Sequence, residues 1–218
     1  MRTFHKSRLP HILPIGAMFF VTYRLADALP QSIVKNLQEE LAEEIDRIKK
    51  EKQKDWSLQV LNAKKRYFGK FDKQLDEEPY GKCYLKIPEI AEIVKESLEK
   101  WDDKWYDLLA YCIMPNHVHV LIDTSTQLGN QDGRIWTEEE LEDKYVQLDK
   151  IMKRIKGSSA RYINLALDRK GTLWQKDSYD HYVRNEREWR NILSYILENP
   201  VKAKLVKHWK DWPYSYYK

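Results

Sequence analysis

Two histidines separated by one residue are the side chains of this sequence best suited to chemistry. His117 and His119 begin the apolar run 117–122 (HVHVLI), directly after the turn-forming residues 114–116 (MPN). Because side chains alternate faces along a β-strand, both imidazoles are expected on one face and Val118, Val120 and Ile122 on the other, against a core. Two neighbouring imidazoles can hold one divalent cation, so the sequence predicts a metal site on this strand.

A tyrosine and an asparagine one helical turn apart form a second candidate pair. The sequence predicts a helix that begins after the N-cap Asn185, with Glu188 in a capping-box-like position. It is expected to end at Glu198, because the residue before a proline is pushed out of helical geometry. At about 100° per residue, Tyr195 and Asn199 fall on one edge of its apolar stripe. A half-buried tyrosine and a helix-ending Asn-Pro pair without any chemistry would give the same pattern.

Together these residues suit a reaction at phosphorus. His117, His119 and the amide oxygen of Asn199 would supply three ligands to Mg²⁺ or Mn²⁺, which leave coordination positions open for phosphate. Such a metal stabilises charge developing on the phosphate, and Tyr195 could then attack phosphorus to form a covalent intermediate. The sequence contains no His-Glu-x-x-His motif and no closely spaced cysteine pair, which disfavours a zinc hydrolase.

Positive charge is concentrated in the last third of the chain. Residues 150–218 contain sixteen Lys/Arg and seven Asp/Glu, so they carry +9 in a chain whose net charge is +4. Aromatic residues are interspersed among them, and aromatic faces stack on unpaired bases while cations hold phosphates. This pattern predicts a nucleic-acid partner, although unevenly distributed surface lysines would look the same. The candidate DNA contacts are Lys153, Arg154, Lys156, Arg161 and Arg184.

Two other side chains could take part in the reaction. Tyr179 is a rival nucleophile, and it lies in an extended segment next to His181. We favour Tyr195 because Asn199 shares its helix face. His181 could contact the site, the DNA or only a backbone carbonyl.

The elements that must position these residues indicate an α+β protein. The second and third predicted strands are joined too tightly to be parallel. We therefore expect a ferredoxin-like antiparallel sheet with helices packed on one face, in a single domain spanning 1–218 with an insertion or arm at about 55–87. Strands or extended segments are predicted at 17–25, 105–113, 117–122 and 173–183, and helices at 30–54, from Pro88, at 137–167 with a bend near Gly157, and at 185–198.

Composition limits the class of protein. A length of 218 residues suits one domain with a full core. No apolar run is long enough to cross a bilayer, so no membrane association is expected. Two cysteines, Cys83 and Cys112, imply no disulfide framework, which favours a cytoplasmic protein.

At these residues the chain resembles a known family. Residues 114–122 (MPNHVHVLI) are similar to the His-hydrophobic-His motif of single-tyrosine transposases in the HUH endonuclease superfamily. Residues 195–203 (YILENPVKA) are similar to the Tyr-x-x-x-Asn-Pro segment of REP-associated tyrosine transposases. Segments 173–175, 179–181 and 211–215 also match that subgroup, whereas Lys204 stands where many relatives have glycine.

This resemblance implies a ferredoxin-like bacterial or archaeal enzyme that cleaves and joins single-stranded DNA beside hairpins. By position, it implies that Tyr195 forms a 5′-phosphotyrosine link and releases a 3′-hydroxyl, and that His117, His119 and Asn199 hold Mg²⁺ or Mn²⁺. The alternative is a catalytically retired module that binds DNA or RNA hairpins. Both a monomer and a homodimer remain open.

Overall fold

The structure is a computed structural model that describes residues 2–6, 10–51, 54–77, 80–128 and 137–218. It divides into two compact units, one formed by Met1–Ala26 with Tyr84–Lys218 and the other by Asp27–Cys83. The expectation of a single domain with an arm at about 55–87 stays a prediction. None of the described helices has the length and apolar character needed to cross a bilayer.

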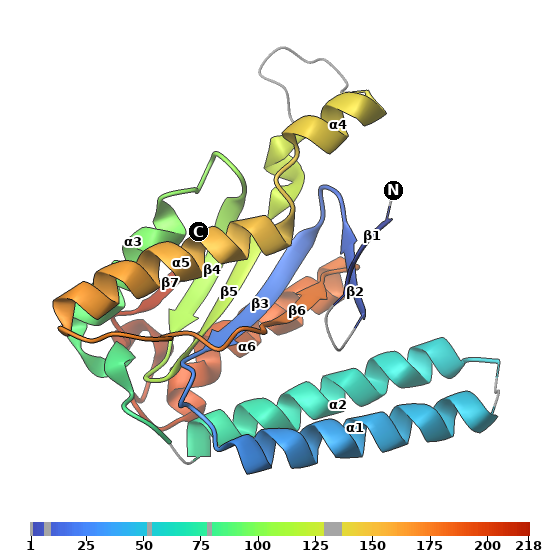
Figure 1. The fold of residues 1–218 in the computed structure, drawn as a ribbon, viewed down its shortest axis with the longest axis horizontal. Coiled ribbons are helices and arrows are strands. Elements are labelled where there is room, and N and C mark those ends of the chain that lie inside the picture. The colour runs from blue at the N-terminus through green and yellow to red at the C-terminus, as the bar shows by residue number, and fades with distance from the viewer. Residues whose placement is uncertain (1, 7–9, 52–53, 78–79, 129–136) are drawn as a thin grey trace. The chain divides into compact units, whose positions relative to one another are not determined.

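The first unit is built on a five-stranded sheet (Figure 1). Its strands run in the order β6-β3-β5-β4-β7, and every neighbouring pair is antiparallel. The predicted hairpin is confirmed, because β4 pairs directly with β5. The strand bounds are Met18–Arg24 for β3, Asp107–Ile113 for β4, His117–Asp123 for β5, Tyr179–Tyr182 for β6 and Ser215–Tyr217 for β7.

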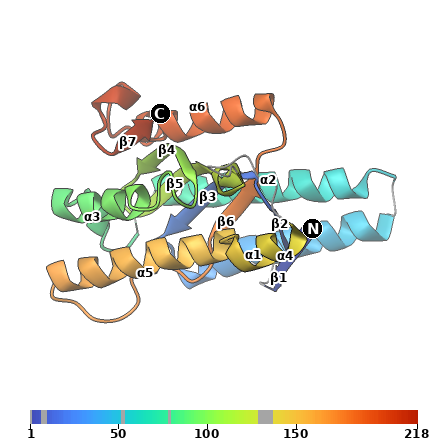
Figure 2. The ribbon, with the colours of Figure 1, turned by 90° about the horizontal axis from the view of Figure 1, so that it is seen from above.

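Helices cover both faces of this sheet rather than the one face expected. Helix α5 (Leu148–Ala166) lies on one side with α3 (Pro88–Glu99) packed beside it, and α6 (Glu186–Lys202) lies on the other side (Figure 2). The α+β class and the ferredoxin-like antiparallel sheet are confirmed. Alternation along β5 therefore directs Val118, Val120 and Ile122 to the α3–α5 layer and its histidines to the α6 layer.

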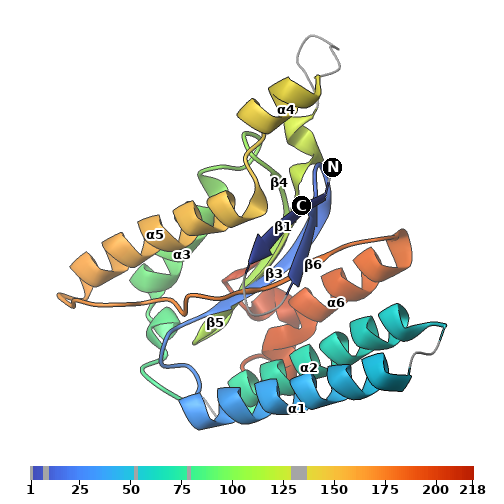
Figure 3. The same cartoon turned by 45° about the vertical axis from the view of Figure 1, so that its right-hand side comes forward.

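The predicted helix at 137–167 is two helices, and the break is not near Gly157. Helix α4 (Glu138–Lys144) ends before Tyr145, and Gly157 lies inside α5 (Figure 3). Tyr145 is buried, and its hydroxyl donates to Thr124 Oγ1 at 2.8 Å and accepts from the Gly16 backbone N–H at 3.1 Å. These long-range bonds hold the chain extended at 145–147, which the helical periodicity does not reveal.

Helix α6 continues to Lys202, whereas the sequence predicted an end at Glu198. Pro200 lacks a backbone N–H, but near the end of a helix this removes a single hydrogen bond. The following turn is kept, because Ala203 N still donates to Asn199 O at 2.9 Å. Asn199 and Pro200 are both buried, so packing retains the helical geometry that the Asn-Pro sequence disfavours.

The remaining short elements of the first unit complete its framework. Strands β1 (Arg2–Lys6) and β2 (Pro10–Pro14) form a separate antiparallel hairpin that the sequence analysis did not predict. Three turns of 3₁₀ helix lie at Tyr84–Lys86, Thr124–Gln127 and Trp209–Asp211.

The second unit is a pair of helices joined by a short connection. Helix α1 (Gln31–Glu51) agrees with the helix predicted at 30–54. Helix α2 (Trp56–Glu77) packs along α1 and was not predicted. Exposed ion pairs cross between the two helices, from Arg66 to Glu44 at 2.5 Å and from Lys70 to Glu40 at 2.8 Å.

Candidate active site

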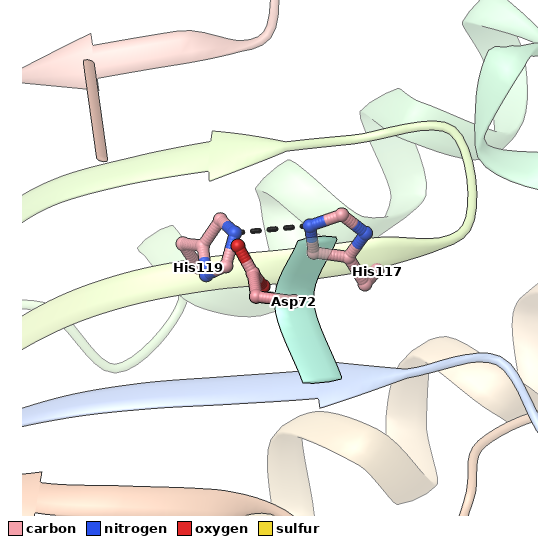
Figure 4. Close-up of side chains that lie close together, drawn as sticks. All are labelled: Asp72, His117 and His119. Atoms are coloured by element: carbon pink, nitrogen blue, oxygen red, sulfur yellow. Dashed lines mark hydrogen bonds between the residues drawn. The ribbon is translucent and has the colours of Figure 1, made fainter. Parts of the chain in front are cut away.

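The predicted histidine pair lies side by side on β5. His117 and His119 are fully buried, and their Nε2 atoms are 2.9 Å apart with the ring planes at 79° (Figure 4). Asp72, also drawn there, belongs to α2 of the other unit and is not counted in the site. The pair therefore presents two nitrogens to a common point.

Each imidazole is oriented by a partner on its other nitrogen. His117 Nδ1 is 2.7 Å from Asn116 Oδ1, and His119 Nδ1 is 2.7 Å from Thr22 Oγ1 on the neighbouring strand. An amide oxygen only accepts, so His117 Nδ1 carries the proton and its Nε2 offers a lone pair. A hydroxyl can accept from His119 Nδ1 as well, and in that tautomer both Nε2 atoms can offer a lone pair to a cation.

The electrostatic surroundings keep His119 neutral. Burial, with a smaller contribution from the positive charge of Lys202, lowers the pKa of His119 to about 3. The ring is therefore unprotonated at neutral pH, and a neutral imidazole is the form that binds metal.

Asn199 completes the group from the α6 layer. It is 1% exposed, and its Nδ2 lies 3.1 Å from His119 Nε2. Its Oδ1 is buried and has no hydrogen-bond partner among the described residues. A buried oxygen without a partner is costly, and a cation beside the histidines would satisfy it once the amide rotates. Two imidazole nitrogens and this oxygen are ligand types that can hold a divalent cation.

Tyr195 lies one turn before Asn199 and contacts the same histidine. Its ring packs edge-on against His119, with centroids 5.4 Å apart, and against Phe20 at 5.9 Å. Lys202 Nζ lies 4.7 Å from the centroid of the tyrosine ring. The structure thus brings together His117, His119, Asn199 and Tyr195.

Sequence reasoning missed two members of this group. Lys202 follows Tyr195 by seven residues, or nearly two full turns, so the helical spacing could have identified it. Thr22 faces His119 only because β3 and β5 pair in the register that sets these two residues opposite each other. No local pattern in the sequence predicts that register.

The rival residues lie on β6, the edge strand that pairs with β3. Tyr179 is paired with Thr22, and its ring packs against Phe20 at 6.2 Å, so it shares the face of the histidines. Burial raises its pKa above the usual range, which disfavours the phenolate. His181 Nε2 bonds Glu188 Oε1 at 2.8 Å, at the start of α6.

The candidate DNA contacts differ in their surroundings. Lys153, Arg154 and Arg161 are exposed on α5, across the sheet from α6. Lys156 instead donates to Gln175 O at 2.7 Å, to Lys176 O at 2.9 Å and to Ser178 Oγ at 3.1 Å. Its ammonium is therefore hydrogen-bonded within the protein rather than directed to DNA. The guanidinium of Arg184 lies 4.3 Å from the centroid of the Tyr182 ring.

Comparison with known proteins points to one family. No family model matches the chain. It is 31% identical over 137 residues to a REP-associated tyrosine transposase of Haemophilus influenzae, a match covering 62% of this chain and 71% of that relative. It is 27% identical over 113 residues to a REP-associated tyrosine transposase of Escherichia coli, covering 52% of this chain and 55% of that relative.

A solved structure supports the fold. The chain resembles the structure of a REP-associated tyrosine transposase bound to a REP hairpin, with a TM-score of 0.50 and 17% sequence identity. The match covers 96% of this chain and 81% of that one, so the shared architecture extends over nearly the whole sequence.

Proposed function

This chain belongs to the family of REP-associated tyrosine transposases, and from that premise we propose that it is a metal-dependent enzyme that cleaves and joins single-stranded DNA at hairpins. One observation carries the proposal. The buried Nε2 atoms of His117 and His119 face each other beside the unpartnered Oδ1 of Asn199, and a tyrosine ring packs against the same histidine.

His117, His119 and Asn199 would hold a divalent metal, Mg²⁺ or Mn²⁺. When bound there, the metal would polarise a DNA phosphate and stabilise the charge that develops on it. The protein's part is to fix the ligands. Thr22 and Asn116 orient the two rings through their Nδ1 atoms, and burial keeps His119 neutral.

Tyr195 would act as the nucleophile. Its phenol oxygen attacks the phosphorus, a new bond joins tyrosine to the 5′-phosphate, and the bond to the 3′-oxygen breaks to release a 3′-hydroxyl. Overall, the phenolic proton is transferred, through solvent, to the departing 3′-oxygen, so a 3′-hydroxyl is the product. Lys202, whose Nζ lies 4.7 Å from the ring centroid, supplies positive charge where negative charge develops.

The DNA substrate is held by cations outside the site. The relative of known structure is bound to a REP hairpin, and we extend that partner to this chain. We propose Lys153, Arg154 and Arg161 on α5 and Arg184 before α6 as contacts to phosphates, which supply most of the affinity of DNA-binding proteins.

The test is formation of a covalent adduct. The protein is incubated with single-stranded hairpin oligonucleotides, taken from repeated palindromes flanking its gene, and Mn²⁺, and the products are separated under denaturing conditions. We expect a protein–DNA adduct that is lost in Tyr195→Phe and kept in Tyr179→Phe. The His117→Ala/His119→Ala variant should form no adduct while its affinity for the hairpin changes only a few-fold, because phosphate contacts dominate binding.

Three results would overturn the proposal. An adduct that persists in Tyr195→Phe removes the tyrosine assignment, and full cleavage by the double histidine variant removes the metal site. Hairpin binding without an adduct on any candidate sequence identifies the chain as a binding module that has lost the reaction.

A further inference from the structure

Two stacked tryptophans lie at the end of α3, away from the histidine pair. Trp101 and Trp105 are in the segment between α3 and β4, with ring centroids 3.8 Å apart and planes at 2°. The Nε1 donor of Trp101 is buried without an acceptor in the described part of the chain. A hydrogen bond from Trp101 therefore does not explain why the two indoles stack.

Three cations surround this pair. Lys100 Nζ is 5.5 Å and Lys104 Nζ is 5.4 Å from the Trp101 ring centroid. The guanidinium of Arg154 reaches both rings, at 5.9 Å from Trp101 and 5.3 Å from Trp105. Cations are attracted to aromatic faces, but three like charges around one indole repel one another. An anion placed among them would relieve that repulsion.

The neighbouring acidic residues already have other partners. Asp102 Oδ1 accepts from Leu108 N at 2.7 Å, and Asp107 pairs with Lys218. None of the three cations around the indoles forms an ion pair with a carboxylate in the part of the chain that the structure describes. Asp103 likewise lies nearest Lys218, at 3.8 Å, so no direct ion pair among the described residues occupies the three cations and they can bind an anion from outside.

The exposed side of α5 extends the cluster. Lys150, Lys153 and Arg161 are exposed on the same helix as Arg154, and Tyr162 is 54% exposed beside them. Arg161 follows Arg154 by seven residues, about 10 Å along the helix. Cations in a row with aromatic faces between them match a strand whose phosphates and bases alternate.

We propose that Trp101, Trp105 and the cations Lys100, Lys104 and Arg154 bind an unpaired stretch of single-stranded DNA. A base stacks on the indole pair while flanking phosphates lie among the three cations, which move aside from the ring faces. The proposal rests on the proposed function only in taking DNA as the partner. Because α5 lies across the sheet from α6, this surface holds the strand away from the reacting phosphate.

The experiment measures binding without any reaction. The Tyr195→Phe protein, in EDTA, is titrated with a labelled oligothymidine and with an abasic oligonucleotide of the same length, which keeps the phosphates and removes the bases. We expect Trp101→Ala/Trp105→Ala to weaken binding of the oligothymidine about tenfold or more and to leave the abasic probe unchanged, since stacking acts through the base. Trp56→Ala is the matched control, because Trp56 is 47% exposed on α2.

Additional variants separate stacking from charge and from misfolding. Trp101→Phe/Trp105→Phe keeps stacking faces and should recover most of the affinity. Arg154→Gln should weaken both probes and reduce the salt dependence of binding by about one phosphate contact, whereas the exposed Lys35→Ala on α1 should not. Unchanged oligothymidine binding in the alanine pair, an equal loss with the abasic probe, or equally weak binding of the alanine and phenylalanine pairs would each overturn the proposal.

This design separates the two proposals. If no covalent adduct forms with the wild-type chain but the alanine pair loses oligothymidine binding, the proposed reaction fails and the stacking surface stands. If adducts form and binding is unchanged in the alanine pair, the reverse holds.

Discussion

Thr22 is the residue through which β3 acts on the candidate metal site. Its hydroxyl lies 2.7 Å from His119 Nδ1 and is buried with it. With no cation bound, the two Nε2 atoms can share one proton, and the threonine hydroxyl then donates to Nδ1. With a cation bound, the hydroxyl accepts instead. This reversal makes Thr22 a positioning residue rather than a ligand.

Replacing Thr22 by valine tests that role. The variant keeps the shape of the side chain and removes the acceptor for His119 Nδ1, so we expect the affinity for Mn²⁺ to fall about ten- to a hundredfold, as for other residues that orient a ligand. Isothermal titration with Mn²⁺ measures the change. Thr22→Ser keeps the hydroxyl and should bind Mn²⁺ nearly as well as wild type, and equal affinity of the valine and wild-type proteins would contradict the assignment.

Among single residues, the sequence predicted those of the candidate site that are related by the repeat of one strand or one helix. The alternation of β5 is enough to pair His117 with His119, and the angular spacing of α6 is enough to pair Tyr195 with Asn199. Thr22 could not be predicted, because it is joined to the site by strand register over a separation of 97 residues.

The elements differ in how far their own sequence determines them. Short runs rich in apolar residues located β3, β4 and β5, which are buried on both faces, and the helical period located α1, which buries one face. The break between α4 and α5 depends on the bonds of Tyr145 to distant residues, which no window of sequence contains. The continuation of α6 past Pro200 likewise depends on tertiary burial.

Lys156 links α5 to the extended segment 175–178, and its titration should be visible in the stability of the protein. Burial lowers its pKa from 10.5 to about 8, with Arg24 adding to the shift and Asp177 opposing it. In the unfolded chain the pKa returns to about 10.4. Between these two values the unfolded chain binds more protons, so this lysine makes the free energy of unfolding rise with pH.

The Lys156→Met variant lacks this titration. The difference in unfolding free energy, wild type minus variant, should therefore increase by about 2 kcal/mol between about pH 7.5 and pH 9.5. Urea denaturation of both proteins at each pH provides the measurement. A difference that stays constant over this range would mean that Lys156 titrates as an exposed lysine does.

In the whole molecule, β5 and α6 belong to the same unit of one chain. The histidines come from the centre of the sheet, and Tyr195 and Asn199 come from a helix that packs on that same sheet. Every residue of the proposed site is thus supplied in cis, although 76 positions separate His119 from Tyr195 in the sequence.

Mixing two inactive proteins checks this arrangement. His117→Ala/His119→Ala lacks the proposed metal ligands, and Tyr195→Phe lacks the proposed nucleophile. If each site is completed within one chain, neither variant supplies the part that the other lacks, and the mixture should form no adduct at any ratio or concentration. Recovered adduct would show that α6 is exchanged between chains.

The location of all proposed site residues in one unit of one chain also has a kinetic consequence. An active centre completed inside a single polypeptide has no assembly step to lose on dilution. The specific activity of the enzyme should then be independent of its concentration, and a cell holding very few copies would contain as many working centres as molecules.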